Sequence, residues 1–178
     1  KVNGSWKLQD GEFLKKAADI NDPDHLITPY CFKNPLAPYA AADLENIRID
    51  LNKVHHAFIE LTSRHQFVVI EGAGGLLVPI QKDYLFANLI KDFNIPVVVV
   101  ARRGLGTINH TLLTLKAAQS YGIKVSGIIF NNYSNCNYGT AEKTNPKIIE
   151  DISSIPVLGE MPFLLNLSLK NLARTIEE

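Results

Sequence analysis

The chain has 178 residues, of which 46% are hydrophobic and 20% are charged, so it can bury a core and is not intrinsically disordered. Eighteen basic residues balance eighteen acidic ones, and a formal net charge of zero argues against general nucleic-acid binding, which needs a basic surface. Because the two cysteines, Cys31 and Cys136, are far apart and no run reaches the roughly 18 apolar residues of a membrane span, we expect a reduced, cytoplasmic protein without a membrane segment.

The length favours a single domain covering residues 1–178. Its first part predicts a short helix over 10–18 with Asp10 as the N-cap. Four prolines in 21–40 indicate an irregular connection, with a short strand around 30–32. Asp50 then caps a second helix, which carries apolar residues at helical spacing.

Three histidines lie on or just after this second helix, namely His55, His56 and His65. No further ligand stands at a metal-binding spacing from them. We therefore interpret all three as surface or packing residues.

The most informative stretch is 67–80. Its first four residues are apolar and β-branched or aromatic, which predicts a strand buried on both faces, as in parallel sheets. Glu71 follows at the carboxyl end, where ligands of such sheets bind. A glycine-rich turn comes next, in which a phosphate or a backbone can approach closely. The alternative is a tight turn with an incidental glutamate.

Strands and helices alternate through the rest of the chain. The pattern predicts helices over 83–93, 107–121, 147–153 and 167–178, a polar loop over 137–146, and strands over 97–101, 125–130 and 156–160. The strands over 97–101 and 125–130 read as fully buried, and Gly122 ends the helix before the second of them. This order is typical of an α/β fold with a mostly parallel sheet flanked by helices.

Polar residues follow three of these strands, at Glu71, 102–109 and Asn131–Asn132, and the ends of parallel strands share one edge of the sheet. The helix that begins near Thr107 presents free N–H groups, which suit a carboxylate or phosphate beside Thr107 and Asn109. The alternative for Thr107 is ordinary N-capping. We interpret His110, in the first turn, as a packed structural histidine.

Two further features suggest nucleotide chemistry. The amide of Asn131 has both a donor and an acceptor for the edge of a heterocycle, although asparagine is also common in turns. Asp10 and Glu71 would suit a magnesium site, because Mg²⁺ is usually bound by one or two carboxylates together with phosphate oxygens.

Three segments together resemble the dethiobiotin synthetase family: VVIEGAGGLLVPI, GLGTINHTLLTLKAAQSYGIKVSGIIFNN and PVLGEMPFL. The segments DGEFLKKAA and PYCFKNPLAPYAAA are also similar to that family, so the resemblance covers nearly the whole chain. It implies a P-loop NTPase-like fold and a homodimer with the substrate near the subunit interface. The implied activity is ATP- and Mg²⁺-dependent ring closure, in which 7,8-diaminononanoate is carbamated by CO₂, the carbamate is phosphorylated, and the neighbouring amine displaces phosphate to form dethiobiotin.

The resemblance also implies roles for individual residues. Asp10 and Glu71 would be the Mg²⁺–ATP carboxylates. The remaining nucleotide contacts would be the phosphate-side loop Glu71, Gly72, Ala73 and Gly74, the adenine contacts Asn131 and Asn132, and the other side of the base pocket, Met161, Pro162 and Phe163. The substrate carboxylate, held by the helix start of the partner subunit, would contact Gly106, Thr107, Ile108 and Asn109.

The sequence departs from the family pattern at several points. No G-x-x-x-x-G-K-[ST] phosphate loop is present in the 178 residues, and with it the first strand and helix of the fold are missing. We expect the natural chain to be longer by a unit of roughly 30 or more residues, and the 178 residues alone to be inactive. Lys1 is a candidate for the catalytic lysine, but Val2 stands where proline is expected. Ser168 stands where some relatives have a carboxylate.

Other interpretations remain open. A ligase of the cobyrinic acid diamide synthase type would need an additional amidotransferase domain, for which 178 residues leave no room. A ParA-like ATPase would also need a phosphate loop. A catalytically inactive, dimeric binding or regulatory module of the same fold is supported by the absent phosphate loop.

Overall fold

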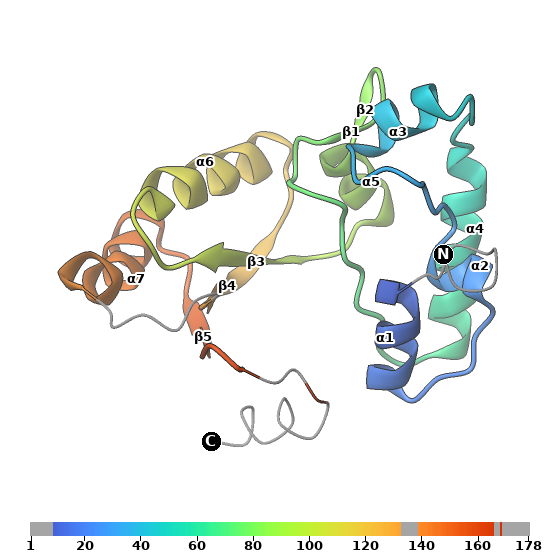
Figure 1. Cartoon of the computed structure of the whole chain (residues 1–178). Helices are drawn as coiled ribbons and strands as arrows, with labels where there is room; N and C mark the ends of the chain where they lie inside the picture. The colour runs from blue at the N-terminus through green and yellow to red at the C-terminus, as the bar shows by residue number, and fades with distance from the viewer. Residues whose placement is uncertain (1–8, 133–138, 166–167, 169–178) are drawn as a thin grey trace. The chain divides into compact units, whose positions relative to one another are not determined.

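The computed structural model describes residues 9–132, 139–165 and 168. The chain divides into two compact units, residues 1–86 and 87–178, whose elements are labelled in Figure 1. No helix in the described ranges is both long enough and apolar enough to cross a membrane. The predicted terminal helix over 167–178 lies almost wholly outside the described residues.

The first unit contains four helices and a small hairpin. Their bounds are α1 Gln9–Ala18, α2 Asp24–Ile27, α3 Pro38–Leu44, α4 Leu51–Arg64, β1 Pro79–Gln81 and β2 Tyr84–Leu85. Helix α2 contacts both α1 and α4, whereas α3 packs against β1. The predicted cap of α4 is confirmed, because the Asp50 carboxylate accepts a hydrogen bond from the N–H of Asn52 at 2.9 Å.

Two predictions for the first part of this unit are wrong. Asp10 lies inside α1, in its first turn, rather than at the N-cap. Residues 30–32 do not form a strand; the ring of Tyr30 stacks on Phe32 with centroids 6.2 Å apart. The hydroxyl of Tyr30 also accepts a hydrogen bond from the N–H of Asp50 at 2.7 Å. Side chains, rather than strand pairing, therefore hold this connection in place.

The predicted strand over 67–70 is also wrong. Phe67 is 84% exposed and Val69 is 81% exposed, and within the described residues this run pairs with no other strand. A run of apolar residues becomes a buried strand only when a neighbour satisfies its backbone groups. Pairing occurs instead just beyond it, between β1 and β2. This hairpin also explains why the next helix begins at Phe86 rather than at residue 83.

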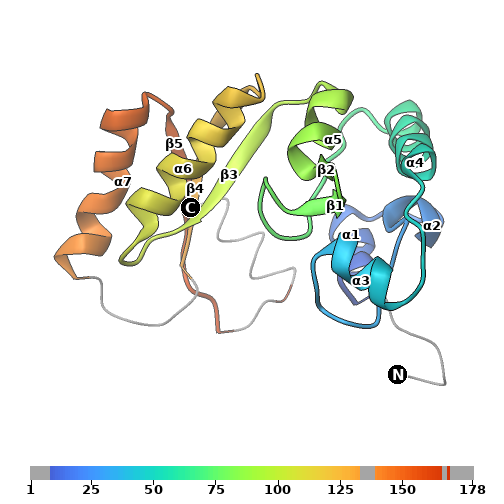
Figure 2. The ribbon, with the colours of Figure 1, turned by 90° about the horizontal axis from the view of Figure 1, so that it is seen from above.

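The second unit is built on a parallel three-stranded sheet in the order β3–β4–β5. Its elements are α5 Phe86–Phe93, which begins at the last residue of the first unit, β3 Val97–Arg102, α6 Thr107–Ser120, β4 Val125–Asn131, α7 Thr140–Ser153 and β5 Val157–Met161. Helices α6 and α7 lie side by side over this sheet (Figure 2). The α/β class with a parallel sheet flanked by helices is confirmed.

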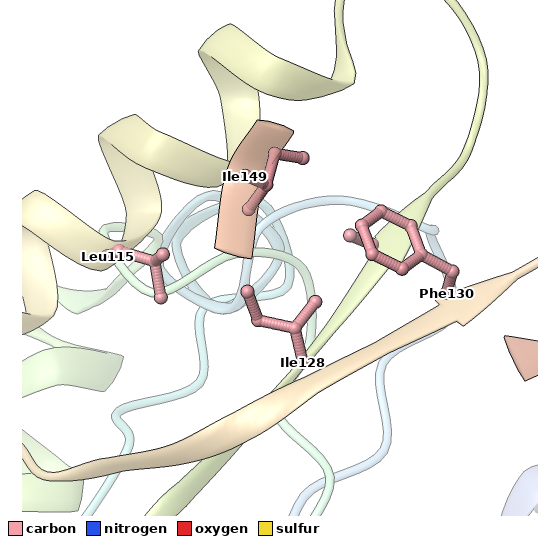
Figure 3. Close-up of a cluster of buried hydrophobic side chains, with 5 residues drawn as sticks. Leu115, Ile128, Phe130 and Ile149 are labelled. Carbon is pink, nitrogen blue, oxygen red and sulfur yellow. The ribbon is translucent and has the colours of Figure 1, made fainter. Parts of the chain in front are cut away.

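The core of this unit lies between the central strand and the two helices. Ile128 and Phe130 of β4 are completely buried, and they meet Leu115 of α6 and Ile149 of α7 (Figure 3). Strand β3 is not fully buried as predicted, since its valines alternate and Val100 is 66% exposed. The helices thus cover one face of the sheet at β3, and among the described residues no element covers the opposite face of this strand.

The starts of α6 and α7 differ from the prediction, whereas the end of α6 agrees with it. Gly106, with φ of 88°, is the N-cap of α6, so Thr107 is not the cap. Gly122, with φ of 69°, follows the last turn and ends the helix as predicted. Helix α7 begins at Thr140 and continues through Pro146, although a loop was predicted over 137–146.

Candidate functional site

The candidate site in the second unit lies where its three parallel strands end. Arg102 of β3 is in register with Asn131 of β4, and Asn131 is in register with Met161 of β5. The N–H of Asn132 also donates to the carbonyl of Met161 at 3.0 Å. The predicted convergence is confirmed for these strand ends, which lie at the edge where ligands of parallel sheets bind.

The start of α6 follows directly from β3. The hydroxyl of Thr107 donates to the carbonyl of Arg102, and its N–H donates to the carbonyl of Gly104 at 3.2 Å. Both polar groups of Thr107 are therefore used inside the turn, and its side chain is buried. The N–H groups of Ile108 and Asn109 belong to the first turn. They donate no hydrogen bond to any acceptor within the part of the chain that the structure describes. They form the free, positively polarised end of a 14-residue helix.

A cavity of about 230 Å³ adjoins this turn. Its polar lining comes from Arg102 and from one face of α6, namely Thr107, His110, Thr111 and Thr114. His110 is exposed at the cavity rather than packed in the core, so its interpretation as a buried structural histidine is wrong. The helix turns this side chain outward because the core-facing positions of α6 are taken by Thr107, Thr111 and Leu115.

The residues expected at the base pocket follow β4 and β5. Asn131 is exposed, whereas Asn132 is 8% exposed, and its side-chain oxygen is buried without a donor among the described residues. Met161 and Phe163 are half-buried, and Pro162 between them is exposed. A buried amide oxygen without a partner is unfavourable, so it would accept a hydrogen bond from a ligand that carries an N–H group.

The phosphate-side candidates belong to the first unit. Glu71, Gly72, Ala73 and Gly74 are all exposed, in a segment without regular structure, so Glu71 does not stand at the end of a strand as predicted. Glycine is required at Gly74, where φ is 91° and an added Cβ would lie 3.0 Å from a methyl group of Val78. Asp10 is exposed on the first turn of α1. Lys1 lies outside the described residues.

Of the three histidines on or after α4, His55 and His65 have hydrogen-bond partners and His56 is exposed, which agrees with their interpretation as surface or packing residues. Nδ1 of His55 contacts the carbonyl of Leu51 at 2.8 Å, and Nε2 of His65 donates to Asp22 at 2.7 Å. Arg64 also contacts Asp22, at 3.2 Å. The hydrogen bond from His65 lowers the pKa of Asp22, Arg64 acts in the same direction, and burial opposes them. No group of three or more metal-binding side chains occurs among the described residues.

Sequence reasoning missed a polar network around Arg103. Its Nε donates to the carbonyl of Glu142 at 2.5 Å, and its guanidinium forms an ion pair with Glu160. The side-chain amide of Asn145 donates to the carbonyl of Arg103 at 2.9 Å. The one sequence signal was Pro146, which has no N–H for a carbonyl four residues earlier and so leaves that of Glu142 open.

Comparison with known proteins identifies the family of the chain. A family model described as an AAA domain matches residues 2–171. The chain is 39% identical to the ATP-dependent dethiobiotin synthetase BioD of Thermodesulfovibrio yellowstonii, over 93% of this chain and 72% of that protein. It is 38% identical to the protein of the same name from Bacillus subtilis (95% and 73%) and 36% identical to that from Nitrosopumilus maritimus (97% and 75%). The chain therefore belongs to the dethiobiotin synthetase family.

Proposed function

We propose that this protein is an ATP-dependent ligase that closes 7,8-diaminononanoate and CO₂ into dethiobiotin. The observation that carries the proposal is the strand register, which brings Asn131, Met161 and the turn before α6 to one edge of the sheet. That edge combines a heterocycle-binding amide with an anion-binding helix start, as a nucleotide and a carboxylate substrate require. The relatives are named ATP-dependent dethiobiotin synthetases, which supports this choice of reaction.

The substrate carboxylate would bind at the start of α6. The free N–H groups of Ile108 and Asn109 are the donors, and Gly106 sets their direction. Thr107 contributes by closing the turn, because its hydroxyl is already bonded to Arg102. In the proposed homodimer, the helix start of one subunit would bind the carboxylate of the substrate in the active site of the other subunit.

The adenine base would bind beside Asn131 and Asn132, with residues 161–163 on its other side. The buried oxygen of Asn132, which has no donor in the part of the chain that the structure describes, fits the exocyclic amine of adenine, which is a donor. The side chain of Asn131 is exposed, so both the donor and the acceptor of its amide could bond to the edge of the adenine ring. Met161 and Phe163 supply half-buried apolar surface for the face of the base.

The phosphates would lie along Glu71–Gly74, with Mg²⁺ held by Asp10 and Glu71. Two exposed carboxylates are hard oxygen ligands, and such a donor set fits Mg²⁺, which takes its other ligands from phosphates and water. When bound, the ion would offset negative charge on the transferring phosphoryl group. Gly74 keeps this segment free of side chains at a backbone angle that other residues rarely adopt. Lys1 remains the candidate for a cation near the carbamate.

The reaction would proceed through three steps. One amine of the substrate attacks CO₂ and loses a proton, which gives a carbamate. A carbamate oxygen then takes the γ-phosphoryl group of ATP, so that ADP leaves and a carbamic-phosphoric anhydride forms. The second amine attacks the anhydride carbon, loses its proton and expels phosphate, which closes the five-membered ureido ring. Binding of the carboxylate at the helix start would hold the diamine in one orientation during these steps.

The test is a turnover assay on the full-length protein with ATP, Mg²⁺, bicarbonate and 7,8-diaminononanoate. The proposal predicts ADP release that requires both the diamine and bicarbonate, with dethiobiotin identified by mass spectrometry. A protein that binds the diamine but releases no ADP would support the inactive binding module instead. The additional phosphate loop stays a prediction, which the intact mass of the natural protein tests.

A further inference from the structure

We propose that Arg103 and Asn145 are positioning residues, which hold the turn before α6 so that the N–H groups of Ile108 and Asn109 meet the substrate carboxylate. This inference rests on the proposed function and deepens it. Neither side chain would contact the substrate. Both act on the backbone of the turn, from one strand end and from a second helix.

The turn is held through its own carbonyl groups. The hydroxyl of Thr107 binds the carbonyl of Arg102, and the side-chain amide of Asn145 binds those of Arg103 and Gly104, at 2.9 and 3.5 Å. Three successive carbonyl groups of the turn are thus held by hydrogen bonds to Thr107 or Asn145. The N–H groups of Ile108 and Asn109 have no acceptor among the described residues, so they can face a ligand.

Asn145 is well placed for this role because it is buried and hydrogen-bonded to the turn. Its side chain is 5% exposed on α7, and its amide reaches across to the turn. A buried amide that lost these acceptors would be left without hydrogen bonds, which is costly. The position of α7 therefore fixes the position of the turn.

Arg103 connects the same turn to α7 a second time. Pro146 lacks the N–H that would bond to the carbonyl of Glu142, and Nε of Arg103 donates to that carbonyl at 2.5 Å. The proline thus opens an acceptor in a helix interior, and the arginine fills it. The side chain of Arg103 is 14% exposed, so the bond is largely shielded from water.

The guanidinium of Arg103 also pairs with Glu160 of β5. Glu160 immediately precedes Met161, at the end of the strand that is in register with Asn131. One planar group with several donors thus ties the turn to a helix and to a strand, whereas a lysine would have a single nitrogen for both acceptors. This difference makes Arg103→Lys an informative conservative variant.

The experiment measures steady-state kinetics of the full-length protein with two substrates. One is 7,8-diaminononanoate, and the other is 2,3-diaminononane, which has a methyl group in place of the carboxylate. Arg103→Met should raise KM for the diamino acid by about tenfold, because the helix start loses its alignment, with kcat nearly unchanged. It should leave KM for the carboxylate-free diamine unchanged, and Arg103→Lys should fall between Arg103→Met and wild type.

Lys147→Met is the matched control. It removes one positive charge from the exposed face of α7, where Lys147 is 71% exposed and pairs with Asp151, and it should change neither KM. An equal rise of KM for both diamines in Arg103→Met would overturn the positioning role, as would no rise for either.

A milder variant covers the case in which Arg103→Met does not fold. Glu160→Gln keeps the bond from Arg103 to Glu142 and removes only the ion pair at a partly exposed side chain. It should raise KM for the diamino acid alone, by about threefold. A KM for the diamino acid equal to that of Lys147→Met would contradict the inference. Wild-type protein without diamine-dependent ADP release would instead refute the proposed function, so the two failures are distinguishable.

Discussion

Replacing Gly106 with alanine tests the backbone conformation at the start of α6 without changing the other residues of the turn. Gly106 has φ of 88°, a conformation that residues with a Cβ rarely adopt. An added Cβ would meet only Cε1 of His110, at 3.8 Å, so no clash contributes. The cost is therefore the backbone penalty alone, about 1–2 kcal/mol. For a chain of this length, that penalty lowers Tm by about 2–8 °C.

Gly104→Ala is the matched control, two residues earlier in the same turn. Gly104 does not have a positive φ, and an added Cβ would meet nothing within 4 Å. Its Tm should therefore equal that of wild type or rise slightly. Calorimetry of both variants, with KM for the diamino acid measured alongside, makes the comparison. Equal Tm values for Gly106→Ala and Gly104→Ala would refute the assigned backbone strain.

Three further predictions concern the first unit. Asp22→Asn should lower stability at neutral pH: the hydrogen bond from His65 lowers the folded pKa of Asp22, so its contribution is complete above the usual value of 3.8 and is lost as pH falls through the folded pKa. In urea unfolding, the free energies of unfolding of the variant and the wild type should converge as the pH is lowered. A difference that stays constant with pH would contradict this. Asp50→Ala should cost about 1 kcal/mol in urea unfolding through loss of the α4 cap, whereas no change would show that the bond to Asn52 is not stabilising. Glu71→Gln should remove most Mg²⁺-dependent turnover of the full-length protein, and near-normal turnover would refute its assignment.

Where sequence patterns and local chemistry agreed, the predictions held. Asp50 caps α4, because an aspartate before an apolar helical pattern supplies the acceptor that the first turn needs. Strand β4 and the stop at Gly122 were also predicted, since a β-branched run and a glycine after the last turn each have one favoured structure. The boundaries of β3 and β5 differed by only one residue at an end.

The wrong predictions share a different cause, which is dependence on distant partners. The run 67–70 has strand composition, but composition cannot supply a neighbouring strand. A loop was predicted over 137–146 because this stretch is polar, yet α7 begins at Thr140, and Arg103 satisfies the carbonyl that Pro146 leaves open. Contacts between residues about 40 positions apart are not visible in local patterns.

The candidate site shows the same division. Parallel strands predicted that Glu71, the turn after β3 and Asn131–Asn132 converge at one edge. The register confirms this for Arg102 and Asn131, whereas Glu71 does not follow a strand. Whether the side chains of Thr107 and His110 face the core or the solvent depends on which face of α6 is buried. The weakly amphipathic sequence of α6 did not reveal that face. The Arg103 network had no sequence signal beyond the proline.

The most direct test of the account measures ADP and dethiobiotin together in one reaction of the full-length protein with ATP, Mg²⁺, bicarbonate and 7,8-diaminononanoate. The account predicts one ADP for each dethiobiotin formed, and no ADP when either the diamine or bicarbonate is left out. ADP release that is independent of the diamine, or bound diamine without dethiobiotin, would contradict it.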